Sequence, residues 1–382
     1  MIHALVIGLL ASASQALLIS SPTGPYAVSM SVQSLTDDTR LDPYAPPNNT
    51  HPRRLMISTF TPVNTTKSPC SAREKVPYMT PLVAQAYDQL GVAVGLPNGT
   101  FSSFEMEFCK PRARSCGHGQ PEFPLVLFSP GWGNPRLLHG AMAREVASHG
   151  FAVVTIDHSY DPSFVEFPDG TVYRAVEIDT DDTAQLEFLT QARCSSVRAD
   201  DTSFVLSHLH THPVPGIDLD RTVMFGHSLG GATAAAAMLQ DPRIKGGINM
   251  DGKLLNPVLE AGLDGPFALV GRPDHADEDP TWDAFFAKLR GPRVQLRVAN
   301  TTHATFTDFP VLISSLNLTL PEAAQQLLES QLGNLQFGRI GKVIAEVVEA
   351  VADLALENKT QSILTKKGNG AFPEVSVLES NL

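Results

Sequence analysis

Residues 223–233 read VMFGHSLGGAT: an apolar run leads into one serine between two glycines, and an alanine-rich run follows. We interpret the apolar run as the end of a buried β-strand and the alanine-rich run as the start of a helix. A G-x-S-x-G sequence between a strand and a helix is typical of a nucleophile elbow, a turn so tight that the serine backbone is strained. In such a turn, side chains in place of Gly226 and Gly230 would collide with the flanking strand or helix, which explains the two glycines. Ser228, between them, is therefore the predicted nucleophile.

The alternative is a glycine-rich turn that holds an incidental serine. The surrounding pattern disfavours it, because buried strands and helices alternate along the chain, as in a mostly parallel, doubly wound α/β sheet with helices on both faces. Predicted strands cover 123–130, 151–157, 222–225, 246–251, 266–271 and 293–299, and predicted helices cover 137–150, 197–210, 231–240, 280–289 and 332–356. The pattern predicts one domain over 17–366 and an irregular tail over 367–382.

Outside this alternation the pattern is less regular. Two further strands and a hairpin are predicted at 26–35, 53–63 and 164–174. The segment 68–121 is rich in proline, glycine and cysteine, and we expect it to be mostly irregular. The acidic run 179–182 is expected to begin a helix over 183–192, because negative charge is favourable at a helix N-terminus.

The composition excludes one class of partner. The chain has 382 residues, of which 43% are hydrophobic, which is enough for one sizeable core. Its formal net charge is -12, and lysine and arginine form no cluster in the sequence. Because nucleic-acid binding depends on clustered positive charge, we do not expect this chain to bind nucleic acid.

The N-terminus is predicted to be a secretory signal peptide over residues 1–16. An apolar run at 4–11 is followed by small residues up to Ala16, near which cleavage is expected. The run is too short to span a bilayer, so no transmembrane segment is expected. The alternative is a buried N-terminal helix, since His3 is the only candidate for a basic side chain before the run.

Two further features favour a secreted protein. N-glycosylation sequons occur at Asn48, Asn64, Asn98, Asn300, Asn317 and Asn358. The four cysteines are Cys70, Cys109, Cys116 and Cys194. In an oxidising compartment they would form two disulfides by one of three pairings, among which the sequence does not choose. The alternative, four reduced and buried cysteines, is disfavoured by the leader.

A serine nucleophile needs a base and an acid, which follow it in the chain in this kind of fold. His303 lies just after the last predicted strand and is the predicted base, with His275 in a polar loop as the alternative. Asp251 ends the strand that follows the elbow and is the predicted acid. The alternative acid, Asp274, lies one strand later among other acidic residues. A solvent-exposed loop explains that acidic stretch without a catalytic role.

The transition state of acyl transfer needs two backbone N–H groups for its oxyanion. One is expected from Leu229, directly after the nucleophile, and the other from Trp132 in the loop 129–133. Gly131 and Gly133 on either side of the tryptophan leave its backbone free to turn toward the pocket. The alternative is an ordinary Gly-Pro turn.

At these residues the chain resembles the platelet-activating factor acetylhydrolase family, of the secreted plasma type and its fungal relatives. The matching motifs, in the same order, are FSPGWG (128–133), DHSYD (157–161), GHSLGG (226–231), NMDG (249–252) and HATFTDF (303–309). The resemblance implies an α/β-hydrolase fold and a serine esterase that cleaves short acyl groups from the sn-2 position of phospholipids. It also implies that Asp251 is the acid.

The chain departs from that family at two positions. Pro130 stands where members often have histidine, and Leu229 stands where they often have phenylalanine. Both changes alter pocket walls rather than backbone donors, so the substrate is less well specified than the reaction. Related actinobacterial lipases and polyester hydrolases share much of this layout.

The leading hypothesis is therefore a secreted carboxylic ester hydrolase that forms an acyl-enzyme on Ser228, acts on a lipid ester and contacts a lipid surface transiently. It needs no metal or cofactor. The histidine tract 208–212 does not predict a metal site, because no cysteine or carboxylate completes the ligand spacing. The alternatives are a lipase, polyesterase or general carboxylesterase of the same fold and, in another class, a hydrolase-fold binding protein without catalysis.

Overall fold

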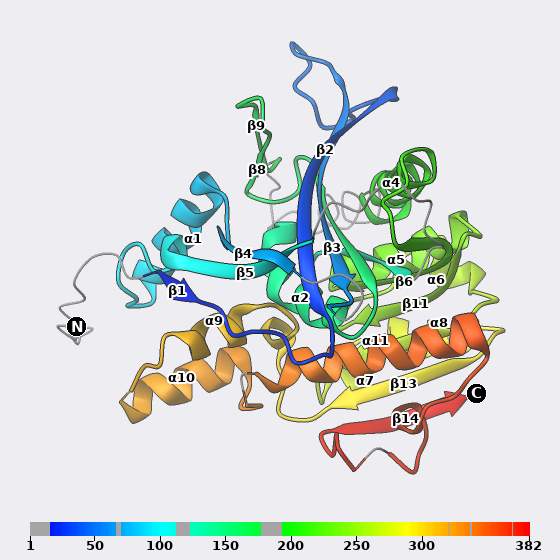
Figure 1. Ribbon diagram of the computed structural model, residues 1–382. Coiled ribbons are helices and arrows are strands. Elements are labelled where there is room, and N and C mark those ends of the chain that lie inside the picture. Colours follow the sequence, from blue (N-terminus) through cyan, green and yellow to red (C-terminus); the bar gives the residue numbers. More distant parts are fainter. Residues whose placement is uncertain are drawn as a thin grey trace.

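The structure, a computed structural model, describes residues 16–65, 70–111, 123–176, 193–319, 321–336, 338–368 and 370–382. Across these residues the largest sheet has nine strands in the order β14-β13-β12-β11-β10-β6-β7-β3-β2 (Figure 1). In chain order they are β2 (Ala27–Leu41), β3 (Pro52–Val63), β6 (Phe123–Ser129), β7 (Ala152–His158), β10 (Ile217–His227), β11 (Ile244–Met250), β12 (Phe267–Gly271), β13 (Arg293–Val298) and β14 (Val375–Asn381). The strands from β13 to β7 pair in parallel, and β14, β3 and β2 are antiparallel to their neighbours. The predicted mostly parallel α/β sheet is confirmed.

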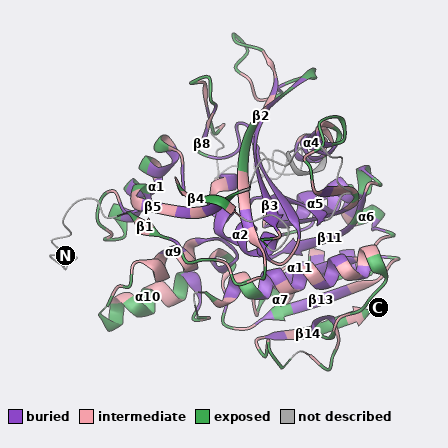
Figure 2. Cartoon of the chain, in the orientation of Figure 1, coloured by how far each residue is buried: buried purple, intermediate pink, exposed green. Residues whose placement is uncertain are grey.

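Helices cover both faces of this sheet. On one face, α2 (Gly140–Ser148) and α11 (Arg339–Glu357) pack into a core cluster with Val126 and Val153. On the other face, α4 (Ala199–Thr211), α5 (Leu229–Gln240) and α8 (Pro280–Phe286) pack with Leu125 and Val154. Side chains of β6 and β7 therefore enter the two clusters alternately, and every residue of both strands is buried (Figure 2). This burial on both faces explains their continuous apolar sequences.

The remaining described elements connect or flank this core. They are β1 (Leu17–Leu18), β4 (Cys70–Pro77), α1 (Pro81–Ala93), η1 (Phe101–Ser103), β5 (Phe104–Pro111), η2 (Arg136–His139), β8 (Phe164–Glu166), β9 (Val172–Arg174), η3 (Arg193–Arg198), α6 (Val258–Ala261), α7 (His275–Glu278), η4 (His303–Phe306), α9 (Phe309–Ser315), α10 (Glu322–Leu332) and η5 (Ser362–Leu364). The hairpin predicted at 164–174 is confirmed as β8 and β9, which pair antiparallel around a turn that contains Gly170.

The segment 68–121 is more regular than we expected. Its described part holds β4, α1 and β5, and β1, β5 and β4 form a separate three-stranded sheet within the described residues. In β5 the buried side chains of Phe104, Met106 and Phe108 alternate with glutamates. The expectation was wrong because this two-residue period favours a strand despite the proline, glycine and cysteine residues in the segment.

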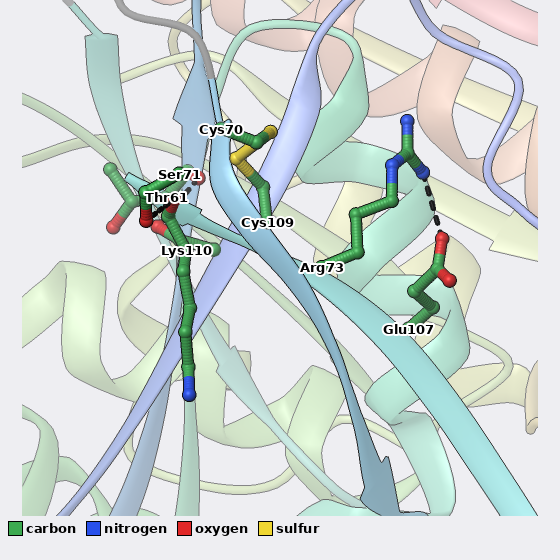
Figure 3. The surroundings of a disulfide bond; sticks show 8 residues. Thr61, Cys70, Ser71, Arg73, Glu107, Cys109 and Lys110 are labelled. Carbon is green, nitrogen blue, oxygen red and sulfur yellow. Dashed lines mark hydrogen bonds and ion pairs between the residues drawn. A yellow bond between two sulfur atoms is a disulfide. The ribbon is translucent and has the colours of Figure 1, made fainter. Parts of the chain in front are cut away.

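A disulfide joins the two longer strands of this small sheet. Cys70 at the start of β4 is bonded to Cys109 in β5, with 5.4 Å between the Cα atoms (Figure 3). An exposed ion pair between Arg73 and Glu107, 2.8 Å long, links the same strands. Of the three pairings left open by the sequence, only the one that contains Cys70–Cys109 agrees with this bond. Cys116 and the side chain of Cys194 lie outside the described residues, so the second predicted disulfide stays a prediction.

The C-terminal region also differs from expectation. The tail expected to be irregular contains β14, which pairs antiparallel with β13 from Arg293↔Asn381 to Val298↔Val375 and forms one edge of the main sheet. The long helix predicted from residue 332 begins instead at Arg339. Gly333, which ends α10, has a φ of 72° and therefore interrupts a continuous helix.

Several expectations remain predictions. Residues 1–15 of the predicted leader, and the acidic run 179–182 with its predicted helix 183–192, lie outside the described residues, and the domain boundaries stay predictions. Five sequon asparagines are exposed and one, Asn64, is half-buried; the exposed ones are Asn48, Asn98, Asn300, Asn317 and Asn358. Among the helices that the structure describes, none is long and apolar enough to cross a membrane.

Candidate active site

Ser228 lies in the turn between β10 and α5 at the carboxyl edge of the sheet. Its backbone has φ 55° and ψ -125°, a conformation that side-chain-bearing residues rarely adopt. A Cβ on Gly226 would lie 2.0 Å from the carbonyl oxygen of Gly230, and a Cβ on Gly230 would lie 1.9 Å from that of Ser129. The two glycines are therefore required by close backbone contacts, as the elbow geometry demands.

Asp251 and His303 come together beside this turn. The Asp251 side chain is fully buried after β11, and its Oδ2 lies 2.6 Å from His303 Nδ1. His227, directly before the candidate nucleophile, has its Nε2 3.0 Å from the carbonyl oxygen of His303, and the two rings lie 4.6 Å apart. The His303 side chain is 51% exposed. Its Nδ1 is thus held by a carboxylate, while the ring faces solvent beside the elbow.

The turn that carries His303 is fixed by its own sequence. The Thr302 hydroxyl and the Thr305 side chain form a capping box at the start of η4. Thr305 Oγ1 also donates to the carbonyl oxygen of Leu332, 2.7 Å away. Downstream, the buried carboxylate of Asp308 accepts from the Ala141 and Met142 N–H groups at the start of α2. These contacts position the candidate base.

The structure brings a second histidine onto the same carboxylate. His275, which the sequence offered only as an alternative base, has its Nδ1 2.9 Å from Asp251 Oδ1, and its side chain is 9% exposed. The backbone N–H of Arg272 donates to the same oxygen at 2.9 Å. Asp274, the alternative acid, is exposed at the N-cap of α7. The geometry therefore favours Asp251 as the acid and His303 as the base.

The electrostatics of the site follow from these contacts. Burial alone would raise the pKa of Asp251, but hydrogen bonds from His275 and His303 and the charge on His275 lower this pKa well below its ordinary value. Burial alone would lower the pKa of His275, but its two carboxylate neighbours, Asp251 and Asp279, raise it to about 9. At neutral pH, Asp251 is thus ionised and His275 is protonated.

The loop after β6 passes over the candidate nucleophile. A Cβ on Gly131 would lie 3.2 Å from the Cβ of Ser228, so the loop backbone is close to the elbow. Gly133 has a φ of 75°, which favours glycine. Leu229 is the first residue of α5, where an N–H has no acceptor within the helix. The two predicted oxyanion donors, Trp132 and Leu229, thus lie on the two backbone segments adjacent to Ser228.

A buried arginine holds this loop, and sequence reasoning missed it. Arg198, 1% exposed, donates to the carbonyl oxygens of Pro130 at 2.6 Å and Gly131 at 3.4 Å, and to Asp161 Oδ2 at 2.8 Å. Asp161 Oδ1 in turn accepts from the Gly133 N–H at 3.2 Å. The backbone is therefore held on both sides of residue 132. The DHSYD motif contains Asp161, and this motif was the one feature of the sequence that could have pointed to the support of the loop.

A second Ser-His-Asp chain lies beneath the loop. Ser129 Oγ is 3.0 Å from His158 Nε2, and His158 Nδ1 is 2.9 Å from Asp201 Oδ2. All three side chains are buried, and Arg53 forms an ion pair with Asp201 at 2.7 Å. Because no substrate reaches fully buried atoms, we interpret this chain as a structural support for the end of β6.

The chain was found to be similar to known hydrolases. Residues 126–335 match the model of the alpha/beta hydrolase family. A probable 1-alkyl-2-acetylglycerophosphocholine esterase of Arthroderma benhamiae is 30% identical over 400 residues, which cover 99% of this chain and 98% of the relative. The platelet-activating factor acetylhydrolase of Bos taurus is 30% identical over 158 residues, 34% of this chain and 35% of that one. A solved ferulic acid esterase from Streptomyces cinnamoneus is 28% identical, with a TM-score of 0.74 over 96% of this chain and 100% of its own.

The chain belongs to the alpha/beta hydrolase family. Within that class it is a carboxylic ester hydrolase, and its resemblance to the platelet-activating factor acetylhydrolases is confirmed. These relatives stand against the hypothesis of a binding protein without catalysis.

Proposed function

We propose that the protein is a secreted serine esterase that removes short sn-2 acyl groups, such as acetyl, from glycerophospholipids. Ser228 Oγ attacks the ester carbonyl carbon while His303 Nε2 takes the hydroxyl proton. The N–H groups of Trp132 and Leu229 bind the tetrahedral oxyanion. When the C–O bond breaks, His303 returns the proton to the leaving alcohol. Water then attacks the acyl-enzyme by the same route and releases the acid.

One observation carries this proposal: a buried carboxylate holds the Nδ1 atom of His303, at 2.6 Å, beside a strained serine turn. The carboxylate of Asp251 fixes the imidazole with Nδ1 as donor, which leaves Nε2 to act as the base. Asp251 remains ionised because its pKa is lowered by the two imidazoles, against the effect of burial. The site thus has the parts that acyl transfer needs within one sheet edge.

The choice of a short acyl group rests on two supports. The relative that covers almost the whole chain is named as a probable 1-alkyl-2-acetylglycerophosphocholine esterase. Trp132 lies in the loop at the elbow and is 37% exposed, and in this proposal its large indole walls off the acyl side of the site. Without a wall each added methylene would gain about 1 kcal/mol of transfer free energy, so an open site would prefer longer chains. The exposure of Trp132 also suits transient contact of the protein with a lipid surface.

The substrate is tested by a chain-length series of 2-acyl phosphocholines measured beside tributyrin, p-nitrophenyl acetate and methyl ferulate. We expect the highest kcat/KM for the 2-acetyl lipid and a steady fall as the acyl chain lengthens. Rates that rise beyond about six carbons would instead indicate a lipase. Preference for methyl ferulate would indicate a feruloyl esterase, the activity named for the solved relative.

Secretion is part of the proposal. It is supported by the Cys70–Cys109 disulfide, which suits an oxidising compartment, and by the exposed sequon asparagines. Expression in a eukaryotic host followed by endoglycosidase treatment tests it. We expect the protein in the medium, with a mass that falls on deglycosylation; an intracellular, unglycosylated product would contradict secretion.

A further inference from the structure

We propose that His275 is a positioning residue for this reaction: held between Asp251 and Asp279, it fixes the orientation of Asp251 toward His303 and places a cationic imidazole behind that carboxylate. The inference rests on the proposed role of His303 as the base. His275 does not itself contact the reacting atoms.

The two oxygens of Asp251 are divided between two imidazoles. His303 Nδ1 lies 2.6 Å from Oδ2, and His275 Nδ1 lies 2.9 Å from Oδ1. A carboxylate held by a single histidine can rotate about its terminal bond. With His275 and the Arg272 N–H both on Oδ1, rotation of Asp251 away from His303 would break the hydrogen bond from Arg272 and the ion pair with His275.

Packing fixes the position of the His275 ring. The ring centroid lies 4.2 Å from that of Trp282, whose side chain is itself 1% exposed. Trp282 Nε1 donates to the carbonyl oxygen of Gly252 at 2.9 Å, so the indole is attached to the turn that carries Asp251. A Cβ on Gly271 would lie 2.8 Å from the indole and 3.1 Å from the Cβ of His275. The strand β12 therefore ends in glycine where these two rings pack.

The charged groups around His275 favour its cationic form. Asp251, after β11, and Asp279, at the N-cap of α8, face its two ring nitrogens, the latter at 3.4 Å. Glu278 lies on α7 with His275 and forms an ion pair with Arg272. The Nε atom of Arg272 is in turn 3.6 Å from Asp251 Oδ2. Asp251 and Asp279 raise the pKa of His275 to about 9, against the effect of burial. The positive charge of His275 offsets part of the negative charge of Asp251.

Two substitutions separate the hydrogen bond from the charge. His275→Asn keeps a side-chain N–H donor near the Nδ1 position but carries no charge, and His275→Phe removes both. We expect His275→Phe to lower kcat about 10- to 100-fold with KM changed less than twofold, because the orientation of Asp251 is lost.

His275→Asn should restore most of kcat. The acid limb of its kcat/KM profile should lie at higher pH than in the wild type, because the neutral amide no longer offsets the charge of Asp251. His210→Asn, at an exposed histidine on α4, is the control.

A second readout does not depend on activity. In the Ser228→Ala background, the downfield proton NMR signal of the His303 Nδ1–H to Asp251 hydrogen bond should be present, and the additional His275→Phe substitution should broaden or remove it. An unchanged signal, with wild-type kcat and pH profile, would overturn the role of His275 while leaving the esterase function intact.

If His275→Phe does not fold, the pH profile of His275→Asn decides: an unshifted acid limb would overturn the inference. Failure of the proposed function would appear differently, as a lack of activity in the wild type.

Discussion

At the scale of single residues, the site depends on two backbone conformations that are rare outside glycine. Ser228 and Asp251 both have φ 55°, and they follow the neighbouring parallel strands β10 and β11. The carboxyl ends of parallel strands meet at one edge of a sheet, so the two turns lie side by side. Gly252 connects them closely: a Cβ there would lie 2.0 Å from the carbonyl oxygen of Ser228. Strained residues of this kind are typical of active sites.

Asp251→Asn is the substitution that tests the choice of acid. A neutral amide cannot stabilise the imidazolium and supports the wrong tautomer of His303, so we expect kcat to fall by about 10⁴-fold. The measurement is kcat on p-nitrophenyl acetate at pH 7.5, with Asp274→Asn as the matched control at near wild-type activity. The reverse pattern, with activity lost only in Asp274→Asn, would move the role of the acid to Asp274.

At the scale of structural elements, the loop 129–133, which carries the proposed oxyanion donor Trp132, is held by residues from other segments than the one that bears Ser228. Arg198, the last residue of η3, contacts the carbonyl oxygens of the loop, and Asp161, after β7, contacts its Gly133 N–H. With the carbonyl groups of Pro130 and Gly131 held by the guanidinium, the loop backbone at Trp132 has little freedom to turn. Oriented backbone donors of this kind stabilise an oxyanion without reorganisation during the reaction.

Asp161→Asn tests this support. The amide oxygen still accepts from the Gly133 N–H, but the ion pair with Arg198 is lost, so the loop should become less well ordered. We expect kcat to fall about 10-fold or more with KM nearly unchanged, since oxyanion donors act mainly in the transition state. Asp169→Asn removes the exposed ion pair with Arg54 and should leave kcat unchanged. Equal kinetics for the two variants would contradict the role of the buried pair.

The disulfide belongs to the same scale, since it joins β4 to β5. Its cysteines are 39 residues apart, and a loop of that length predicts about 2–4 kcal/mol of stabilisation through the unfolded state. Replacing Cys70 and Cys109 together by serine should lower the free energy of unfolding in urea by that amount. Ser71→Ala is the control, and equal unfolding midpoints for both variants would contradict the estimate.

At the scale of the whole molecule, the central architecture could be predicted from the sequence because its signals are local. The continuous apolar strand 123–129 and the glycines at the elbow can each be recognised within a few consecutive residues. The roles of Arg198 and His275 could not be predicted in this way, since each depends on contacts between segments far apart in the chain. Arg198 lies 68 residues from Pro130, and no short motif joins them. Strand β5, in contrast, was missed although its alternation was visible in the sequence, whereas β14 shows no such alternation.

The buried ion network predicts how the whole molecule responds to acid. Burial would raise the pKa of Asp201, but the charge of Arg53 and the hydrogen bond from His158 lower it below its ordinary value of 3.8. A carboxyl whose pKa is lowered on folding contributes stability above about pH 4 and loses that contribution as the pH falls further. The free energy of unfolding should therefore decrease steeply below about pH 4.

Asp201→Asn separates this effect from general acid denaturation. The variant should be less stable than the wild type at pH 7 by about 3–5 kcal/mol, because Arg53 loses a buried partner. In urea unfolding followed by circular dichroism, the difference should stay constant from pH 7 to about pH 5 and shrink as the pH falls from about 4 to about 2. Asp200→Asn, at the more exposed neighbouring position, is the control. A constant difference across this pH range would contradict the lowered pKa.

The central claim is that Ser228 is the nucleophile of an ester hydrolase. The most direct test is labelling by a fluorophosphonate probe, followed by peptide mass spectrometry, of the wild type and of Ser228→Ala. We predict stoichiometric labelling on the peptide that contains Ser228, with parallel loss of activity on the 2-acetyl phosphocholine, and no labelling in the variant. Active protein that is not labelled, or equal labelling of Ser228→Ala, would contradict the account.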